Sequence, residues 1–142
     1  MRMCDKFMNP NSDEIKNILN AAKTIAVVGL SDNPSRASFN VAKYLRQQRY
    51  VIFPVNPTLE YALDQKCYSD LDEIGEEIDI VDIFRRSEFV PEIVEKAMKI
   101  GAKCIWMQDD VAHEAAAQMA RNAGLDVIMN DCILRQHKAL FD

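Results

Sequence analysis

The sequence of 142 residues has no Cys-x-x-Cys pair, because its four cysteines stand far apart at positions 4, 67, 104 and 132. Zinc sites and thioredoxin-like redox couples need closely spaced cysteines or histidines, so both are disfavoured and reduced, mostly buried thiols are expected. The chain also lacks a signal-peptide pattern and any apolar run of about 18 residues. It is therefore expected to be soluble and cytoplasmic, with no membrane partner.

Positive charge is scarce as well. The 17 Lys and Arg residues face 22 Asp and Glu residues, which gives a net charge of −5. Nucleic acids and anionic membranes select surfaces rich in Lys and Arg, so no nucleic-acid partner is expected and phosphate binding must be local. No repeat, low-complexity tract or linker divides the chain. With 49% apolar residues, residues 1–142 are predicted to form one domain.

Apolar, β-branched runs alternate with helical patterns along the whole chain. Strands are predicted at 24–30, 50–55, 79–86, 102–108 and 125–130, and helices at 12–22, 39–48, 91–101, 112–124 and 132–141, with mostly loop at 58–77. Such alternation implies right-handed crossovers. The prediction is an α/β, doubly wound parallel sheet of about five strands with helices on both faces.

Helix ends are marked by polar residues, proline and glycine. Ser12 or Asp13 is expected to cap the first helix. Pro91 is expected in the first turn of the third helix. Gly101 and Gly124 are expected to end the third and fourth helices.

The segment VVGLSDNPSRASF at 27–39 joins the first strand to the second helix. An NAD fingerprint, G-x-G-x-x-G, needs two more glycines after the first and an acid at the end of the second strand. Aligned on Gly29, those glycine positions hold Ser31 and Pro34, and no acid stands at 55–57. The loop is therefore a poor NAD site.

The same loop keeps the features that bind phosphate. Free amides and the dipole of a helix N-terminus favour an anion, and Ser31, Ser35 and Ser38 can donate hydrogen bonds to it. Arg36 adds a cation with a two-pronged grip. The alternative is that Ser35 only caps the helix while Arg36 is solvated, and the spacing does not decide between the two.

Arg85 and Arg86 follow the third strand, at the same edge of the sheet as the first loop. Strand alternation would send them to opposite faces. One could then reach a ligand phosphate while the other pairs with Asp82 or Glu88. Surface salt bridges for both arginines are the alternative.

Five segments in this order and spacing, GLSDNPSRASFNVAKYL, YVIFPVNP, DIVDIFRRSEFVPEIV, CIWMQ and AGLDVIMNDC, resemble the small bacterial and archaeal CoA-binding proteins. The resemblance covers about residues 12–138, and the fold of that family is similar to the CoA-binding domain of the succinyl-CoA synthetase α-subunit. It implies a Rossmann-like domain that holds coenzyme A or an acyl-CoA.

Carried over position by position, the resemblance implies three groups of ligand-binding residues. The phosphate and nucleotide part would be lined by Gly29, Leu30, Ser31, Pro34, Ser35, Arg36 and Ser38. The adenosine would be flanked by Val55, Asn56 and Pro57, with an opposite wall of Phe84, Arg85 and Arg86 and with Val90 and Pro91 beneath.

The chain departs from the family pattern after the fourth strand. The family has Trp-x-Gln followed by an apolar residue and glycine, whereas Gln108 is followed here by Asp109 and Asp110. Two acids would repel an anionic ligand on the pantetheine side, or they would cap the next helix, which is the favoured interpretation.

No catalytic dyad is visible in the sequence. His113 and His137 are expected to be solvated, and Cys132 lies near the ligand edge but is expected to be buried. A non-catalytic module that binds, senses or delivers CoA is therefore predicted, with a protein partner or homo-oligomer left open. The alternatives are an acyl-CoA transforming enzyme, an NAD-linked enzyme with a degenerate fingerprint, or an interaction subunit with a vestigial pocket.

Overall fold

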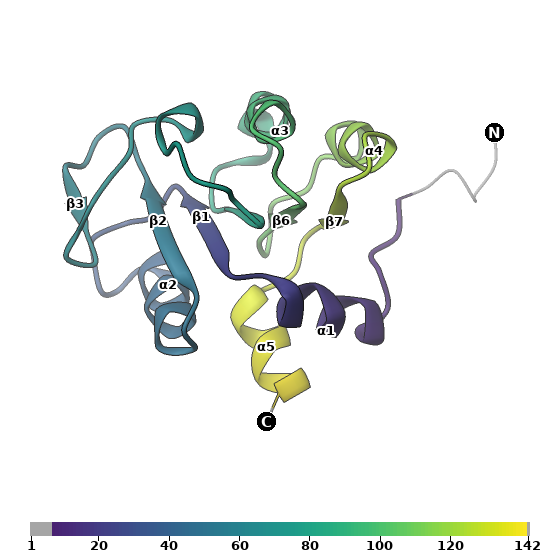
Figure 1. The fold of residues 1–142 in the computed structure, drawn as a ribbon, viewed down its shortest axis with the longest axis horizontal. Helices are drawn as coiled ribbons and strands as arrows, with labels where there is room; N and C mark the ends of the chain where they lie inside the picture. Colours follow the sequence, from purple (N-terminus) through teal and green to yellow (C-terminus); the bar gives the residue numbers. More distant parts are fainter. Residues whose placement is uncertain (1–6, 142) are drawn as a thin grey trace.

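The computed structural model describes residues 7–141, which form a sheet between two layers of helices (Figure 1). The sheet strands are β1 (Thr24–Val28), β2 (Val51–Val55), β5 (Ile80–Ile83), β6 (Cys104–Met107) and β7 (Asp126–Ile128). The helices are α1 (Ser12–Ala21), α2 (Ala37–Gln47), α3 (Val90–Lys99), α4 (Glu114–Asn122) and α5 (Ile133–Phe141). Shorter elements are the hairpin of β3 (Tyr61–Ala62) and β4 (Gln65–Lys66) and the 3₁₀ turns η2 (Leu71–Glu73) and η3 (Ser87–Phe89).

All sheet strands run parallel, in the order β2-β1-β5-β6-β7. Helices α1, α2 and α5 cover one face, and α3 and α4 cover the other (Figure 1). The predicted α/β, Rossmann-like doubly wound fold of five strands is therefore confirmed.

Strand β1 shows why the strands appear in the sequence as continuous apolar runs. Ile25 and Val27 pack against α1, α2 and α5, while Ala26 and Val28 belong to the cluster beneath α3 and α4. Because both faces are covered, alternation buries every position. The strands are nevertheless shorter than the apolar runs. Leu30 is fully buried but lies beyond the end of β1, so hydrophobicity marks the core and not the end of the strand.

Two of the predicted helix caps are wrong. The N-cap of α1 is Asn11, which forms a capping box with Glu14, because the helix already begins at Ser12. The N-cap of α4 is His113, whose Nδ1 accepts a hydrogen bond of 3.1 Å from the amide of Ala116, so the acids at 109 and 110 do not cap it. Pro91 lies in the first turn of α3 as predicted.

The glycines that were predicted to end α3 and α4 are found at those positions. Gly101 and Gly124 follow α3 and α4 with φ angles of 77° and 95°, as expected for glycines that end helices.

His137 was predicted to be solvated, but it is buried. Its Nδ1 lies 2.7 Å from the hydroxyl of Tyr44, and its ring stacks on Phe141.

Other parts of the chain form hydrogen bonds at both edges of the sheet. At the β2 edge, the carbonyl of Pro54 accepts a hydrogen bond from the amide of Tyr68, and the carbonyl of Tyr68 accepts one from Asn56. Proline suits this edge strand because it has no amide hydrogen to leave unpaired. At the β7 edge, the side-chain amide of Asn9 donates to the carbonyl of Met129 at 2.9 Å and accepts from its amide at 2.8 Å.

One carboxyl group lies inside the core. Asp82 is fully buried in β5, with Val27 and Trp106 as its neighbours on the adjacent strands. Neither carboxyl oxygen has a hydrogen-bond partner among residues 7–141. Burial raises the pKa of this group well above its ordinary value, so the group favours the neutral form.

Candidate functional site

The strand order places a candidate site between β1 and β5. The chain leaves β1 for α2 on one face of the sheet and leaves β5 for α3 on the other face. Parallel sheets bind ligands in the crevice that opens at such a reversal, beyond the carboxyl ends of the strands. The loops that follow β1, β2 and β5 are therefore the candidate ligand site.

Gly29 makes the turn after β1, where its φ is 88° and its amide donates to the carbonyl of Val55 at 2.8 Å. A Cβ at this position would lie 3.1 Å from Cδ of Arg85 and 3.3 Å from the backbone carbon of Phe84. Both the backbone angle and the close approach of the next loop therefore require glycine.

The serines of the loop hold the loop itself together. The amide of Ser31 donates to Oγ of Ser38 at 2.9 Å, and the amide of Asn33 donates to Oγ of Ser31 at 3.0 Å. The hydroxyl of Ser35 donates to Oδ1 of Asn33 at 2.9 Å. Ser31 and Ser38 use only their oxygens in these bonds, so their hydroxyl hydrogens remain able to donate.

The N-terminus of α2 has no side-chain cap. Its N-cap residue is Arg36 and not Ser35, so the alternative prediction of a Ser35 cap is wrong. The first turns of α1, α3 and α4 each contain an acid, whereas that of α2 contains none. The first turn of α2 therefore offers no acid to offset its free amides and the positive end of the helix dipole beside Arg36.

Asn56 ties the loop after β2 to the loop after β1. Its Nδ2 donates to the carbonyl of Leu30 at 2.9 Å, and its Oδ1 accepts from the amide of Thr58 at 2.9 Å and from its hydroxyl at 2.7 Å. The side chain of Leu30 is fully buried in the core, so only its backbone can face a ligand. Asn56 therefore positions the site through its side-chain hydrogen bonds.

Arg85 and Arg86 do not lie on opposite faces, because β5 already ends at Ile83. Both guanidinium groups lie over the ring of Phe89, at 4.3 Å and 5.9 Å from its centroid. Neither arginine forms an ion pair within residues 7–141. The predicted pairing with Asp82 or Glu88 is therefore wrong, since Asp82 lies inside the core and Glu88 makes no such contact.

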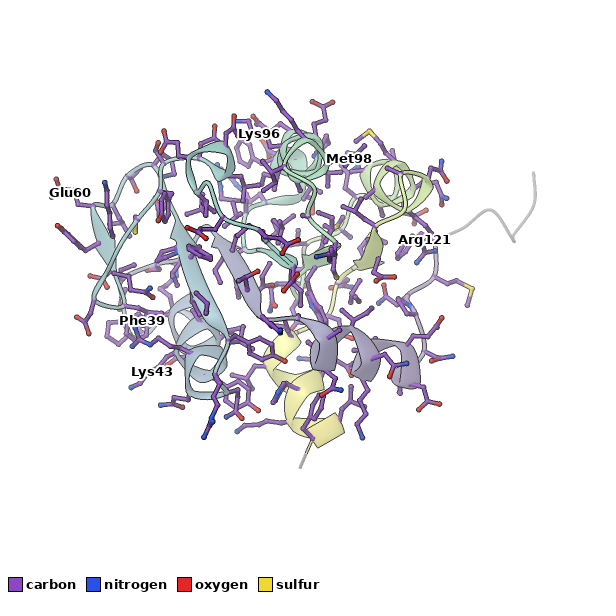
Figure 2. All side chains as sticks on the ribbon, viewed as in Figure 1. Phe39, Lys43, Glu60, Lys96, Met98 and Arg121 are labelled. Atoms are coloured by element: carbon purple, nitrogen blue, oxygen red, sulfur yellow. The ribbon has the colours of Figure 1, made fainter. Side chains whose placement is uncertain are left out.

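Two hollows open at this edge, and Arg85, which reaches across Gly29, lies between them. The α2 hollow is lined by Gly29, Ser31, Asp32, Asn33, Arg36, Asn56, Thr58 and Leu59. The α3 hollow is lined by Val28, Val55, Pro57, Ser69, Asp70, Leu71, Arg85, Phe89, Glu92, Ile93 and Lys96, of which Lys96 is labelled on α3 in Figure 2.

Eight predicted site residues line neither hollow: Leu30, Pro34, Ser35, Ser38, Phe84, Arg86, Val90 and Pro91. Pro34 is exposed, Phe84 packs partly buried against the core cluster of α1, α2 and α5, and Val90 is fully buried at the start of α3. Sequence reasoning also missed Phe89 and Thr58. Phe89 contacts the two arginines, and Thr58 donates hydrogen bonds to Asn56. Only these spatial contacts, which the sequence does not show, link the two residues to the site.

One of the two acids after β6, Asp109, belongs to an ion-pair network. Both carboxylate oxygens of Asp109 accept hydrogen bonds from the guanidinium of Arg135, at 3.0 Å and 2.9 Å, which lowers the pKa of Asp109. Arg135 also donates to Asp131 at 2.8 Å. Asp110 has a φ of 68°, the backbone region that glycine adopts most readily, and its amide donates to Asn130.

The thiols and acids show no metal site in the described part of the chain. Cys67 and Cys104 are buried and free, and Cys132 is half-buried at the start of α5. From residue 7 to residue 141 no group of three His, Cys, Asp or Glu side chains could hold a metal ion. No helix in the same range is long and apolar enough to span a membrane.

Known proteins share this fold and sequence. Residues 23–138 match the family described as CoA binding domain. The chain is 46% identical over 131 residues to the uncharacterized protein YneT of Bacillus subtilis strain 168, which covers 92% of this chain and 97% of the relative. The structure of a hypothetical protein from Pyrococcus horikoshii OT3 has a TM-score of 0.91 and 37% identity, with 100% of this chain and 98% of that chain covered.

A larger relative shares a shorter region. The acetate–CoA ligase [ADP-forming] II of Archaeoglobus fulgidus is 32% identical over 83 residues, which cover 57% of this chain and only 12% of the ligase. The family match spans most of the sequence, including the loops after β1, β2 and β5. The chain belongs to the CoA-binding domain family.

Proposed function

We propose that this chain binds coenzyme A, free or acylated, at the carboxyl edge of β1, β2 and β5. The observation that carries the proposal is the uncapped, acid-free N-terminus of α2 beside Arg36, which is suited to a phosphate group. Gly29 lets the loop that carries Arg85 pack closely against the turn after β1, which brings this second cation near the same site. The family assignment supports the same class of ligand.

The two hollows suit the two chemical halves of a nucleotide. The phosphates would lie in the α2 hollow, near Ser31, Ser35, Arg36 and Ser38. The adenosine would lie toward the α3 hollow, which is lined by Val55, Pro57 and Arg85, while Asn56 lines the neighbouring α2 hollow. Phe84, Arg86, Val90, Pro91 and the backbone of Leu30 would complete the surrounding wall.

A binding, sensing or delivery role, as a single cytoplasmic domain, is proposed in preference to catalysis. His113 is used as a helix cap, and His137 packs with Tyr44 and Phe141 against α2 and α5. Neither histidine lines the α2 hollow or the α3 hollow.

The second candidate function is an acyl-CoA transforming enzyme, which the half-buried thiol of Cys132 favours. Turnover of an acyl-CoA that disappears in Cys132→Ser would establish it.

Calorimetry on the ligand-free protein tests the ligand class. CoA is expected to bind more tightly than ADP and NAD, because the site has no acid for a ribose 2′-hydroxyl at the end of β2. Native mass spectrometry of the purified protein is expected to show a co-purifying mass of CoA or acyl-CoA. Binding of CoA only in the millimolar range, with NAD equal or better, would contradict the proposal.

Arg36→Ala is expected to weaken CoA binding roughly tenfold, the loss typical of one charge-assisted hydrogen bond. A larger loss for CoA than for dephospho-CoA would place Arg36 at the 3′-phosphate, whereas equal losses would place it at the pyrophosphate. Lys43→Ala, which removes the same charge from the exposed side of α2, is the control and is expected to change neither affinity (Figure 2). Unchanged CoA affinity in Arg36→Ala would remove Arg36 from the site.

A further inference from the structure

Two consecutive arginines share one aromatic ring at the ligand edge. Cζ of Arg85 lies 4.3 Å and Cζ of Arg86 5.9 Å from the centroid of Phe89, both within the range of a cation–π interaction. The ring itself is half-buried against the core cluster beneath α3 and α4. Phe89 therefore contacts two cations while its ring is packed against the core.

An aromatic ring holds a guanidinium group without neutralising it. Arg135, in the same protein, is held instead by the carboxylates of Asp109 and Asp131, which occupy three of its hydrogen bonds and compensate its charge. The contact of Arg85 and Arg86 with Phe89 uses the face of the ring, so the N–H donors of both arginines stay available for an anion.

Hydrogen bonds hold the turn that carries Arg86 and Phe89 in place. The amide of Phe89 donates to the carbonyl of Arg86 at 2.9 Å within η3, and Oγ of Ser87 accepts from the amide of Ala112 at 2.9 Å. On its other side, the aliphatic part of Arg85 lies against Gly29. Arg85 is therefore held between Gly29 and Phe89, beside both hollows.

We propose that Phe89 is a positioning residue that presents Arg85 and Arg86, with their charges uncompensated, to phosphate groups of the ligand. The proposal rests on the proposed function, since it concerns the same CoA site. It assigns to the ring a role that acts through the two guanidinium groups and not through contact with the ligand. The ring thereby increases affinity for the charged part of CoA.

The test compares CoA affinity in Phe89→Met and in the wild type. Loss of the ring at nearly constant volume is expected to weaken CoA binding roughly 3- to 10-fold at low salt. The ratio of the two affinities is expected to approach one near ~1 M salt, where charges are screened within about 3 Å. Phe89→Tyr keeps the ring face and is expected to retain affinity within about twofold.

Phe53→Met is the matched control, because Phe53 is also half-buried on the same core cluster but has no cation over its ring within residues 7–141. It is expected to leave CoA affinity unchanged. In a background with Arg85→Gln and Arg86→Gln, Phe89→Met is expected to have no further effect. A loss that persists in that background, or that is equal at low and high salt, overturns the proposal. Absence of CoA binding by the wild type overturns the proposed function as well.

Discussion

Replacing Asp82 with valine is expected to raise the free energy of unfolding by about 1–3 kcal/mol at neutral pH, the range for a buried polar group that has no partner. Asp82 is fully buried in β5, and both of its carboxyl oxygens lack a hydrogen bond among residues 7–141. Valine suits the position because β-branched side chains fit a strand that is covered on both faces. Urea unfolding at pH 7 measures the change.

The gain is also expected to depend on pH. Burial raises the folded-state pKa of Asp82 well above its unfolded value of about 3.9. Between those two values the folded state holds a proton that the unfolded chain has lost. Wild-type stability therefore falls as pH rises through this window, and the advantage of Asp82→Val grows. Burial, followed by the charges of Asp126 and Asp82, also raises the pKa of the nearby Cys104 thiol. This thiol therefore stays neutral over the same pH window.

Asp82→Asn is the control that separates charge from hydrogen bonding. Asparagine does not titrate but remains a polar group without a partner. The free energy of unfolding of Asp82→Asn is therefore expected to lose this pH dependence and to rise less than that of Asp82→Val. Asp79 and Asp109 have lowered pKa values and contribute in the opposite direction, but they are present in every variant and cancel in the comparison. A stability of Asp82→Val below that of the wild type would refute the interpretation.

Gly29→Ala is expected to lower the free energy of unfolding by about 1–2 kcal/mol, the cost of a left-handed backbone for an L-residue. It is also expected to weaken CoA binding by roughly tenfold or more, because the new Cβ would lie 3.1 Å from Cδ of Arg85 and displace that side chain. Thermal unfolding and calorimetry with CoA measure the two effects.

Gly75→Ala provides the matched control for the backbone cost. Gly75 has a φ of 71°, but a Cβ there would meet nothing within 4 Å, and the residue lines neither the α2 hollow nor the α3 hollow. The stability loss is expected to be similar to that of Gly29→Ala, while CoA affinity is expected to stay at the wild-type value. Equal CoA affinity in both variants would show that the contact between Gly29 and Arg85 does not serve the site.

The fold could be predicted from the sequence because its strongest signals are local. Runs such as TIAVV contain β-branched and small apolar residues for both faces of a strand, and Pro91 marks the first turn of a helix. The helix N-caps were harder to predict from the sequence. Asn11, Ser12 and Asp13 all suit an N-cap chemically, and only the backbone path selects Asn11.

The site could be predicted only in part, since its contacts join distant segments. The loop after β1 was identified from Gly29, the serines and Arg36. The partner of Asp109 is Arg135, on another element, so the acid appeared in the sequence as a helix cap. The arginines after β5 were expected to alternate, but the strand ends at Ile83 and both then turn toward Phe89.

The occupied sheet edges limit how this protein can meet other macromolecules. Recognition by strand addition needs an edge with free amide and carbonyl groups. Tyr68 and Pro54 use those groups on β2, and Asn9 uses those of Met129 beside β7. Strand addition at these positions would have to displace those contacts, whereas helix surfaces and the loops of the ligand edge are open to a client protein or a second copy of the chain, and a bound nucleotide would be part of the surface that those loops present.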